Sequence, residues 1–354
     1  MPSLRPTALN ALLGIAATVI IIAGLRAAAS IVVLFLLAVF LVILIAPIYF
    51  WLQRKGAPSW AALIVLILSM LGIGMFTASF FTNAINDFAG NLTKYQKELT
   101  VQINLGVEWL EAHGVEVEED LVAKTLDTKA LFAQTANLLR SVSVLLSNAF
   151  VIILIAIFIL MEAARLPDKI RHLPGMTNDY LEDLEQIVDN VRQYMGMKAV
   201  MSALTGVLVT ILLTVMGVDY PVLLGVLAFL FNFVPSIGSI IASIPGILLA
   251  LVLHGVADAA IVTVGYVFIN VGISNVLEPR YMGKGLGLSP MIIIVTLFLW
   301  AWILGPIGML LSVPLTMAIK VALEASEKTR GIAYLMSDTV PQAEDSSPEK
   351  KPDA

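Results

Sequence analysis

The chain has 354 residues, 59% of them hydrophobic and only 13% charged, with a formal net charge of −5 and a mean hydropathy of +0.92. Soluble domains are typically ~45–50% apolar and ~25% charged, so this composition excludes an ordinary soluble protein. Stretches of about 18 or more nearly uncharged residues recur along the chain, which predicts an all-α polytopic membrane protein. The absence of cysteine excludes a disulfide framework, a thiolate metal site and a thiol nucleophile.

The N-terminal 30 residues resemble a signal peptide in outline, with Arg5, an apolar run and Ala27-Ala28-Ala29. Because Arg26 closes the run and another apolar stretch begins at once, we expect this segment to be kept as a membrane helix. In total we expect about six transmembrane helices, each near the ~20 residues that cross a bilayer. They are residues 8–25, 29–52, 60–81, 143–161, 199–216 and 258–277.

Two further apolar stretches, 221–253 and 291–323, have a length that fits neither one crossing nor two. Each has 33 residues, which is about 50 Å as one helix at ~1.5 Å per residue, whereas two crossings need ~40 residues and a turn. Both are interrupted near the middle, the first by Pro235-Ser-Ile-Gly238 and the second by Gly305-Pro306. The pattern predicts two re-entrant helical hairpins whose tips are buried by protein or face a watery path.

The distribution of Lys and Arg favours this topology. With a cytoplasmic N-terminus and two hairpins, 15 of the 21 basic residues are cytoplasmic, against 13 if each stretch crosses once. The expected domains are N-terminal transmembrane helices (1–81), a small extracytoplasmic helical insert (82–142), a transmembrane helix (143–161), a cytoplasmic amphipathic segment (162–198), a transport core (199–323) and a cytoplasmic tail (324–354) that is disordered from about residue 341.

Residues 275–290 combine charges, prolines and glycines between two apolar stretches. Gly283-Lys-Gly-Leu-Gly287 matches neither a Walker loop, which needs G-x-x-x-x-G-K-[ST] after a strand, nor a dinucleotide fingerprint, which needs a βαβ unit. We interpret the segment as a cytoplasmic hinge that lets the second hairpin reposition. The hinge or motif residues are Glu278, Pro279, Arg280, Gly283, Gly285 and Gly287, and Glu278 and Arg280 could pair with each other.

The sequence contains no constellation typical of an enzyme or a metal site. Ser236 or Ser239 with His254 imitates a serine–histidine pair, but the serines lie at the hairpin turn and the histidine at its end. The three histidines are far apart, and there is no H-E-x-x-H. We therefore expect no catalysis, no metal, no cofactor and no nucleic-acid partner.

Polar residues gather around the two predicted hairpins. They are Asn232, Ser236, Ser239 and Ser243 in the first, Asn270, Ser274 and Asn275 in the following span, and Ser312 and Thr316 in the second. Hydrogen bonding between helices explains any one of them. Their concentration near two broken helices favours a polar solute site, because broken helices expose carbonyls and helix ends at the midplane of the membrane.

Three segments, taken in order, resemble the autoinducer-2 exporter family of bacterial permeases. They are Phe231-Asn-Phe-Val-Pro-Ser-Ile-Gly-Ser239, Asn275-Val-Leu-Glu-Pro-Arg-Tyr-Met-Gly283 with Gly285-Leu-Gly-Leu288, and Gly305-Pro-Ile-Gly-Met-Leu-Leu-Ser-Val-Pro-Leu315. The resemblance implies a multi-pass protein of the bacterial inner membrane, a homo-pentamer in the lipid bilayer, two helical hairpins per protomer and an elevator-type movement. It also implies export of autoinducer-2, a small polyhydroxylated quorum-sensing signal, although some relatives are assigned as sodium–proton antiporters.

Together these observations predict a transporter that exports a small polar solute, with autoinducer-2 as the expected one. We expect the solute to be bound by Asn232, Pro235, Ser236, Gly238, Ser239, Asn270, Asn275, Gly305 and Pro306. A sodium(lithium)/proton antiporter would need a carboxylate deep in the membrane. The first 19 residues of each hairpin contain none, which favours the exporter. A passive channel or a membrane scaffold is the third interpretation.

Overall fold

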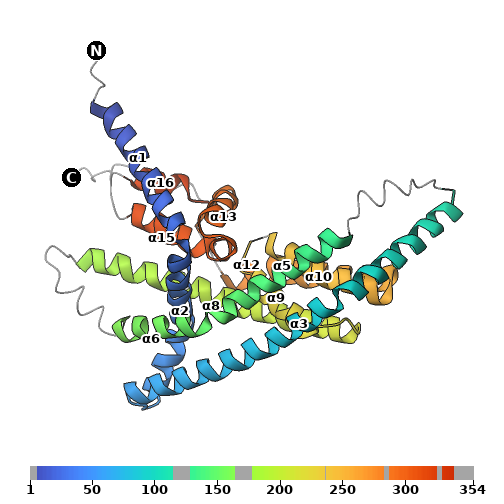
Figure 1. Ribbon diagram of the computed structural model, residues 1–354. Coiled ribbons are helices and arrows are strands. Elements are labelled where there is room, and N and C mark those ends of the chain that lie inside the picture. The colour runs from blue at the N-terminus through green and yellow to red at the C-terminus, as the bar shows by residue number, and fades with distance from the viewer. Residues whose placement is uncertain are drawn as a thin grey trace, which may run out of the picture.

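The computed structural model describes residues 6–114, 128–163, 178–235, 237–282, 287–324 and 329–338, and this part of the chain is helical without any strand. Figure 1 shows how the helices lie. They are α1 (Pro6–Ala27), α2 (Ala29–Arg54), α3 (Ser59–Ala112), α5 (Thr128–Ser147), α6 (Ala149–Ala163), α8 (Asn178–Val215), α9 (Pro221–Phe231), α10 (Ile237–His254), α11 (Val256–Val271), the π-helix η1 (Gly272–Leu277), α12 (Glu278–Met282), α13 (Pro290–Leu304), α14 (Pro306–Leu310), α15 (Ser312–Glu324) and α16 (Arg330–Leu335). The all-α prediction is confirmed, and the tail beyond residue 341 lies outside the described residues.

Five segments of the described chain are long and apolar enough to cross a membrane, so this is a multi-pass membrane protein. They are Ala29–Arg54, Ser59–Trp109, Val191–Val215, Ile237–His254 and Val256–Tyr281. Four of the six predicted spans correspond to these segments, and the other two, 8–25 and 143–161, correspond to the shorter apolar stretches in α1 and α6. The fifth long segment is α10, the second half of the first predicted hairpin.

The first two helices differ from the two separate spans that the sequence predicts. Only Ala28 separates α1 from α2; its N–H donates to the Gly24 carbonyl and its own carbonyl accepts from the Val32 N–H, both at 3.0 Å. The two helices run on in the same general direction, with a bend but no reversal between them (Figure 1). The local cause is a run of alanines, the strongest helix former, without a turn residue.

Two other helices continue across predicted domain boundaries. The 54-residue α3 runs from the predicted span 60–81 far into the predicted insert, and α5 packs back along it (Figure 1). The 38-residue α8 joins the predicted amphipathic segment to the predicted span 199–216. A change in side-chain polarity does not end a helix, because helical backbone groups satisfy one another in water and in lipid alike.

Both 33-residue stretches are broken near the middle, at their proline and glycine residues. The first forms α9 and α10, which pack against each other across a turn that begins at Asn232. In the second, Gly305 separates α13 from α14, and α15 then packs back on α13. The φ angle of Gly305 is 73°, a conformation that glycine adopts without the penalty of a side chain.

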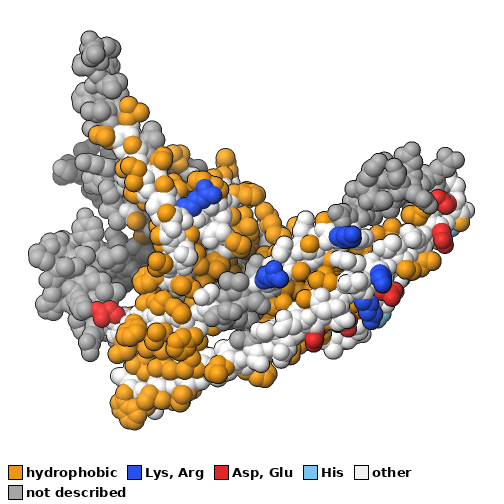
Figure 2. Space-filling model, in the orientation of Figure 1, with side chains coloured by type: hydrophobic (Ala, Val, Ile, Leu, Met, Phe, Trp, Pro, Cys, Tyr) orange, Lys and Arg blue, Asp and Glu red, His pale blue; other side chains and the backbone are white. Residues whose placement is uncertain are grey.

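Two separate apolar clusters hold these two stretches in place. The first cluster joins α9 and α10 to α3, α5, α8 and α11, through residues that include Phe88, Phe132, Leu213, Leu227, Leu249 and Val262. The second cluster joins α13 to α2, α3 and α6, through residues that include Leu37, Val42, Leu66, Ala156, Ile303 and Leu304. Hydrophobic side chains also cover much of the outer surface (Figure 2), as expected where helices face lipid.

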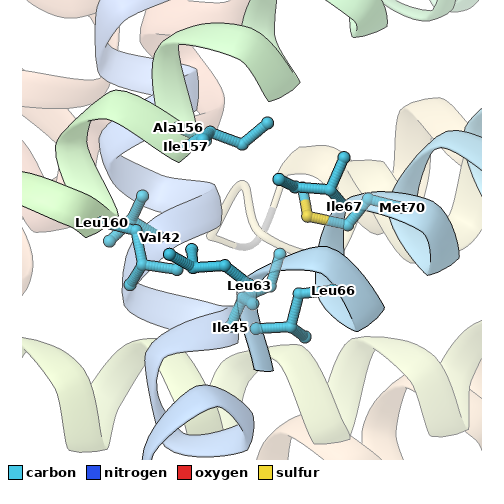
Figure 3. A pocket seen from close by; sticks show the side chains of 9 residues that line it. All are labelled: Val42, Ile45, Leu63, Leu66, Ile67, Met70, Ala156, Ile157 and Leu160. Atoms are coloured by element: carbon cyan, nitrogen blue, oxygen red, sulfur yellow. The ribbon is translucent and has the colours of Figure 1, made fainter. Parts of the chain in front are cut away.

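A small gap lies inside the second cluster, between α2, α3 and α6 (Figure 3). Its volume is about 10 Å³, and it is lined by Val42, Ile45, Leu63, Leu66, Ile67, Met70, Ala156, Ile157 and Leu160. Every one of these side chains is apolar, so a water molecule there would have no hydrogen-bond partner among them. We interpret this gap as imperfect packing rather than as a binding site.

Candidate functional site

A much larger cavity, of about 440 Å³, lies between α8, the α9–α10 turn with the start of α10, and the continuous segment α11–η1–α12, and Ile293 of α13 also lines it. This volume falls within the ~300–1,000 Å³ typical of small-molecule sites. Its wall combines amides, hydroxyls and two charged groups with apolar side chains. The lining residues are Tyr194, Lys198, Asn232, Val234, Pro235, Ser239, Ile240, Asn270, Val271, Ser274, Asn275, Glu278 and Ile293.

The π-helix η1 shapes one wall of the cavity. The N–H of Glu278 bonds the carbonyl of Ile273, five residues back. Pro279 provides the cause, since it has no N–H for the Asn275 carbonyl and its ring would clash with that carbonyl in an α-helix. In a regular α-helix Asn270 and Glu278 would point about 80° apart; the extra residue of a π turn reduces this to about 20°, so both side chains reach the cavity.

A buried ion pair joins two walls of the cavity. Lys198 Nζ on α8 donates to Glu278 Oε1 on α12, and the two side chains are only 7% and 15% exposed. Burying a charge is costly unless an opposite charge compensates it, so each group stabilises the other in the wall. They are the only charged residues of the cavity lining within the described chain, and this lining therefore carries no net charge.

Asn232 begins the turn after α9 and is almost fully buried. Its Nδ2 donates to Ser202 Oγ on α8 at 3.0 Å. The two helices cross closely nearby, because a Cβ at Gly225 would lie 2.6 Å from the Gly206 carbonyl oxygen. The amide donor of Asn232 thus serves the contact between α8 and α9, which is the helix-to-helix role expected for polar residues in membranes.

Asn270 differs from Asn232 in its hydrogen bonding. Its Oδ1 is buried and has no hydrogen-bond partner within the described part of the chain. Leaving a buried acceptor unpaired costs about 1–3 kcal/mol, so such an atom indicates a donor supplied by water or by a solute. The hydroxyls of Ser239 and Ser274 line the same cavity. The amides and hydroxyls of the lining therefore offer both acceptors and donors to a hydroxylated molecule.

Five predicted solute-binding residues line the cavity together: Asn232, Pro235, Ser239, Asn270 and Asn275. Gly238 is buried behind them, where an added Cβ would lie 1.9 Å from the Phe231 carbonyl oxygen. Ser236 lies outside the described residues.

Gly305 and Pro306 are not among the lining residues, although the sequence predicts that both tips converge on one site. Their neighbour Leu304 packs into the second cluster. Apolar packing against α2 therefore holds this tip away from the cavity.

The predicted hinge residues are not all alike in the structure. Glu278 lines the cavity and pairs with Lys198 rather than with Arg280. Pro279 and Arg280 continue the helix as α12. Gly287 has a φ of 61°, a conformation that favours glycine, whereas Gly283 and Gly285 lie outside the described residues.

Sequence reasoning missed Lys198 and Tyr194. They are four residues apart on α8 and so lie on the same face. The sequence suggests only a cytoplasmic charge at 198, since the predicted span starts at 199; the continuity of α8 instead brings both residues to the cavity. Lys198 directly precedes an apolar run, and a charged side chain at the edge of a membrane span needs a partner. This position could therefore have indicated Lys198 as a functional residue.

A multi-pass helical membrane protein with a polar cavity between broken helices has the architecture of a membrane transporter. The family described as "AI-2E family transporter" matches residues 15–328. The chain belongs to this family.

Individual relatives agree with the family. The chain is 34% identical over 320 residues to the "AI-2 transport protein TqsA" of Escherichia coli strain K12, which covers 90% of this chain and 93% of that protein. It is 36% identical over 333 residues to a "Putative transport protein" of Haemophilus influenzae, covering 92% and 96%. A more distant relative is a "Sodium-lithium/proton antiporter" of Halobacillus andaensis, with 24% identity over 296 residues, covering 78% and 82%.

Proposed function

We propose that this protein exports a small, uncharged, hydroxylated solute across the bacterial inner membrane, and that the solute is autoinducer-2. The observation that carries the proposal is the polar cavity, whose lining includes the amides of Asn270 and Asn275 and the hydroxyls of Ser239 and Ser274. Similarity to the "AI-2 transport protein TqsA" over 90% of the chain supports the choice of solute.

Hydrogen bonding explains how the cavity would hold such a solute. The solute hydroxyls would exchange hydrogen bonds with the side chains of Ser239, Ser274, Asn270 and Asn275, which line the cavity. These bonds would replace those that the solute loses when it leaves water, so its transfer into the protein would cost little free energy.

The lengths of α9 and α13 support the proposal that both broken stretches are re-entrant hairpins, although α10 by itself is long enough to cross a membrane. α9 has 11 residues and α13 has 15, or ~16 Å and ~22 Å, which is less than the ~30 Å hydrocarbon core. Because the two stretches pack in separate apolar clusters, the α9–α10 body could slide past the α2–α13 body in an elevator movement. In the shifted state Gly305 and Pro306 would reach the solute.

The proposed orientation puts Lys284 and the tail in the cytoplasm and the insert 82–142 outside, in a homo-pentamer. The bias of basic residues supports this orientation. Asn270 lies 14 residues after Val256, the first residue of α11, which is ~21 Å along the helix. With Val256 at the outer side, the cavity would lie toward the cytoplasm, where an exporter loads its solute.

Exchange of sodium or lithium for protons is the second candidate function, and Glu278 is the observation that favours it. The sequence gives no carboxylate in the first 19 residues of either hairpin, but the structure brings a glutamate from the following segment to the cavity. A carboxylate in a membrane cavity is what cation exchange needs. In this structure Glu278 is already engaged by Lys198, so we rank this function below export of a neutral solute.

Transport by inverted membrane vesicles distinguishes these functions. Vesicles that contain the protein should take up autoinducer-2, with a rate that saturates as its concentration rises. Vesicles from cells without the protein serve as the control. Sodium-driven proton movement without uptake of autoinducer-2 would establish the antiporter instead, and uptake that never saturates would establish a passive channel.

A further inference from the structure

The charge of the cavity wall has a consequence for which solutes can enter. Lys198 and Glu278 are the only charged residues among the described lining residues, and each is the partner of the other. A charged solute that enters this cavity would give up its hydration without finding a free counter-charge. An uncharged solute loses only hydrogen bonds, which the amides and hydroxyls of the wall can replace.

We propose that the Lys198–Glu278 ion pair is the charge-selectivity element of the cavity, which admits uncharged hydroxylated molecules and rejects anions and cations of similar size. The inference rests on the proposed function for the identity of the site, and it assigns a role in specificity to both residues. Selectivity here comes from mutual neutralisation: the ammonium is withheld from anions and the carboxylate from cations.

The position of the pair argues against a purely structural role. Lys198 follows Tyr194 by one helical turn and Glu278 follows Asn275 on the next turn, and all four side chains line the cavity. A second ion pair, Lys320 with Glu324 at 3.2 Å, lies within α15, and neither of its residues lines the cavity. That pair provides a matched control, because Glu324→Gln also removes the carboxylate partner of a lysine, but away from the cavity.

The decisive variant is Glu278→Gln, which frees the ammonium of Lys198 inside the cavity and keeps the shape of the side chain. We expect the purified variant in detergent to bind ribose 5-phosphate roughly ten- to 100-fold more tightly than the wild type, the range for a hydrogen bond to a charged group. Its affinity for ribose, which lacks the phosphate, should not show this gain. Glu324→Gln should leave the affinity for ribose 5-phosphate at the wild-type level.

The reciprocal variant tests the other sign of charge. Lys198→Gln frees the carboxylate of Glu278, and we expect a similar gain in affinity for glucosamine, a hydroxylated cation, and none for ribose 5-phosphate. Restoring a pair with reversed orientation, in Lys198→Glu/Glu278→Lys, should abolish both gains. A general loss of stability cannot make one variant bind an anion more tightly and the other bind a cation more tightly. A purely structural role of the pair would therefore not produce these gains.

Several results would overturn the inference. One is a folded Glu278→Gln protein, by its melting curve and gel-filtration profile, with wild-type affinity for ribose 5-phosphate. Another is a wild-type protein that binds ribose 5-phosphate as tightly as the variant. If Glu278→Gln does not fold, Lys198→Gln decides in the same way with glucosamine. Uptake of autoinducer-2 is measured separately: gains of affinity together with no uptake would disprove the proposed substrate and leave the charge selectivity intact.

Discussion

The two broken stretches of this protein, residues 221–253 and 291–323, have the same backbone arrangement at their breaks. In each, a glycine beyond the break packs against a carbonyl of the preceding helix. An added Cβ at Gly238 would lie 1.9 Å from the Phe231 oxygen, and one at Gly308 would lie 2.1 Å from the Trp300 oxygen. Neither site has room for a side chain, so the close packing of both tips depends on glycine.

The side chains around the two breaks differ completely. At the first break Asn232 and Ser239 reach the polar cavity. At the second, Ile303 and Leu304 pack into the apolar cluster with α2 and α6. The comparison teaches that breaking a helix in a membrane opens the backbone but does not create a site; the polarity of the neighbouring side chains decides whether a solute or another helix fills the opening.

The largest expected effect tests whether the second stretch enters and leaves the membrane on the same side. Cysteines introduced at Lys284 and Glu324, which flank this stretch, should both resist a membrane-impermeant thiol reagent added to intact cells, because both sites are cytoplasmic in a hairpin. A cysteine at the exposed Glu108 should react completely. Because the chain has no native cysteine, labelling is read without background. Reaction at only one of the two flanking sites would mean that the stretch crosses the membrane.

The next effect tests the feature that the two tips share. Gly238→Ala and Gly308→Ala should each lower the free energy of unfolding by about 3 kcal/mol, the upper end for overpacking, because the new methyl group meets backbone that cannot rotate away. Thermal unfolding in detergent measures this. Gly106→Ala in α3 is the control, since nothing lies within 4 Å of its Cβ position, and it should not destabilise the protein. If only one of the two variants lost stability, the conclusion that both tips depend on glycine for their close packing would be wrong.

A pair of substitutions compares a residue that lines the cavity with a residue of the second stretch that does not. Asn270 Oδ1 and Ser312 Oγ are both buried and lack a hydrogen-bond partner within the described chain, but only Asn270 lines the cavity. Asn270→Leu should raise the half-saturation concentration for autoinducer-2 roughly five- to 150-fold, because a contact worth ~1–3 kcal/mol is lost.

Its matched control, Ser312→Ala, should change transport little. Neither variant should be less stable than the wild type, since each removes an unpaired polar group. Wild-type transport kinetics in Asn270→Leu would remove this residue from the site, and a large transport defect in Ser312→Ala would place Ser312 at the solute.

The smallest effect concerns a hydrogen bond within the second stretch. Trp300 Nε1 donates to Thr316 Oγ1 at 3.2 Å and ties α13 to α15. Thr316→Val keeps the shape but removes this acceptor and the hydroxyl's own hydrogen bond to the Ser312 carbonyl, so we expect a loss of about 1–3 kcal/mol in the free energy of unfolding with unchanged half-saturation of transport. A change in half-saturation without a change in melting temperature would show that this contact belongs to solute binding.

The sequence predicts the breaks and much of the cavity wall because these depend on local chemistry. Proline and glycine interrupt a helix wherever they occur, and polar side chains in an apolar run need partners, which is why Asn232, Ser239 and Asn275 could be identified. The two tips look alike in sequence, however, and only packing distinguishes the one at the cavity from the one at α2.

Other features of the site depend on contacts between distant parts of the chain. Lys198 and Glu278 are 80 residues apart, and no local pattern indicates that they meet. The π-helix has a local cause in Pro279, but a proline also ends or kinks helices, so its presence alone does not predict a π turn. The continuity of α8 could not be predicted either, because the side chains change from polar to apolar at the membrane surface while the backbone stays helical.

The size of the cavity also determines how much water takes part in transport. Its 440 Å³ could hold on the order of fifteen water molecules at ~30 Å³ each. A solute of a few ring atoms displaces only some of them, so each transport cycle would carry a small volume of water along with the solute. Binding would then be a competition with mobile water, in which many hydroxylated molecules of similar size fit and none is held tightly. Such a site would suit the proposed exporter, which has to release its solute on the far side of the membrane.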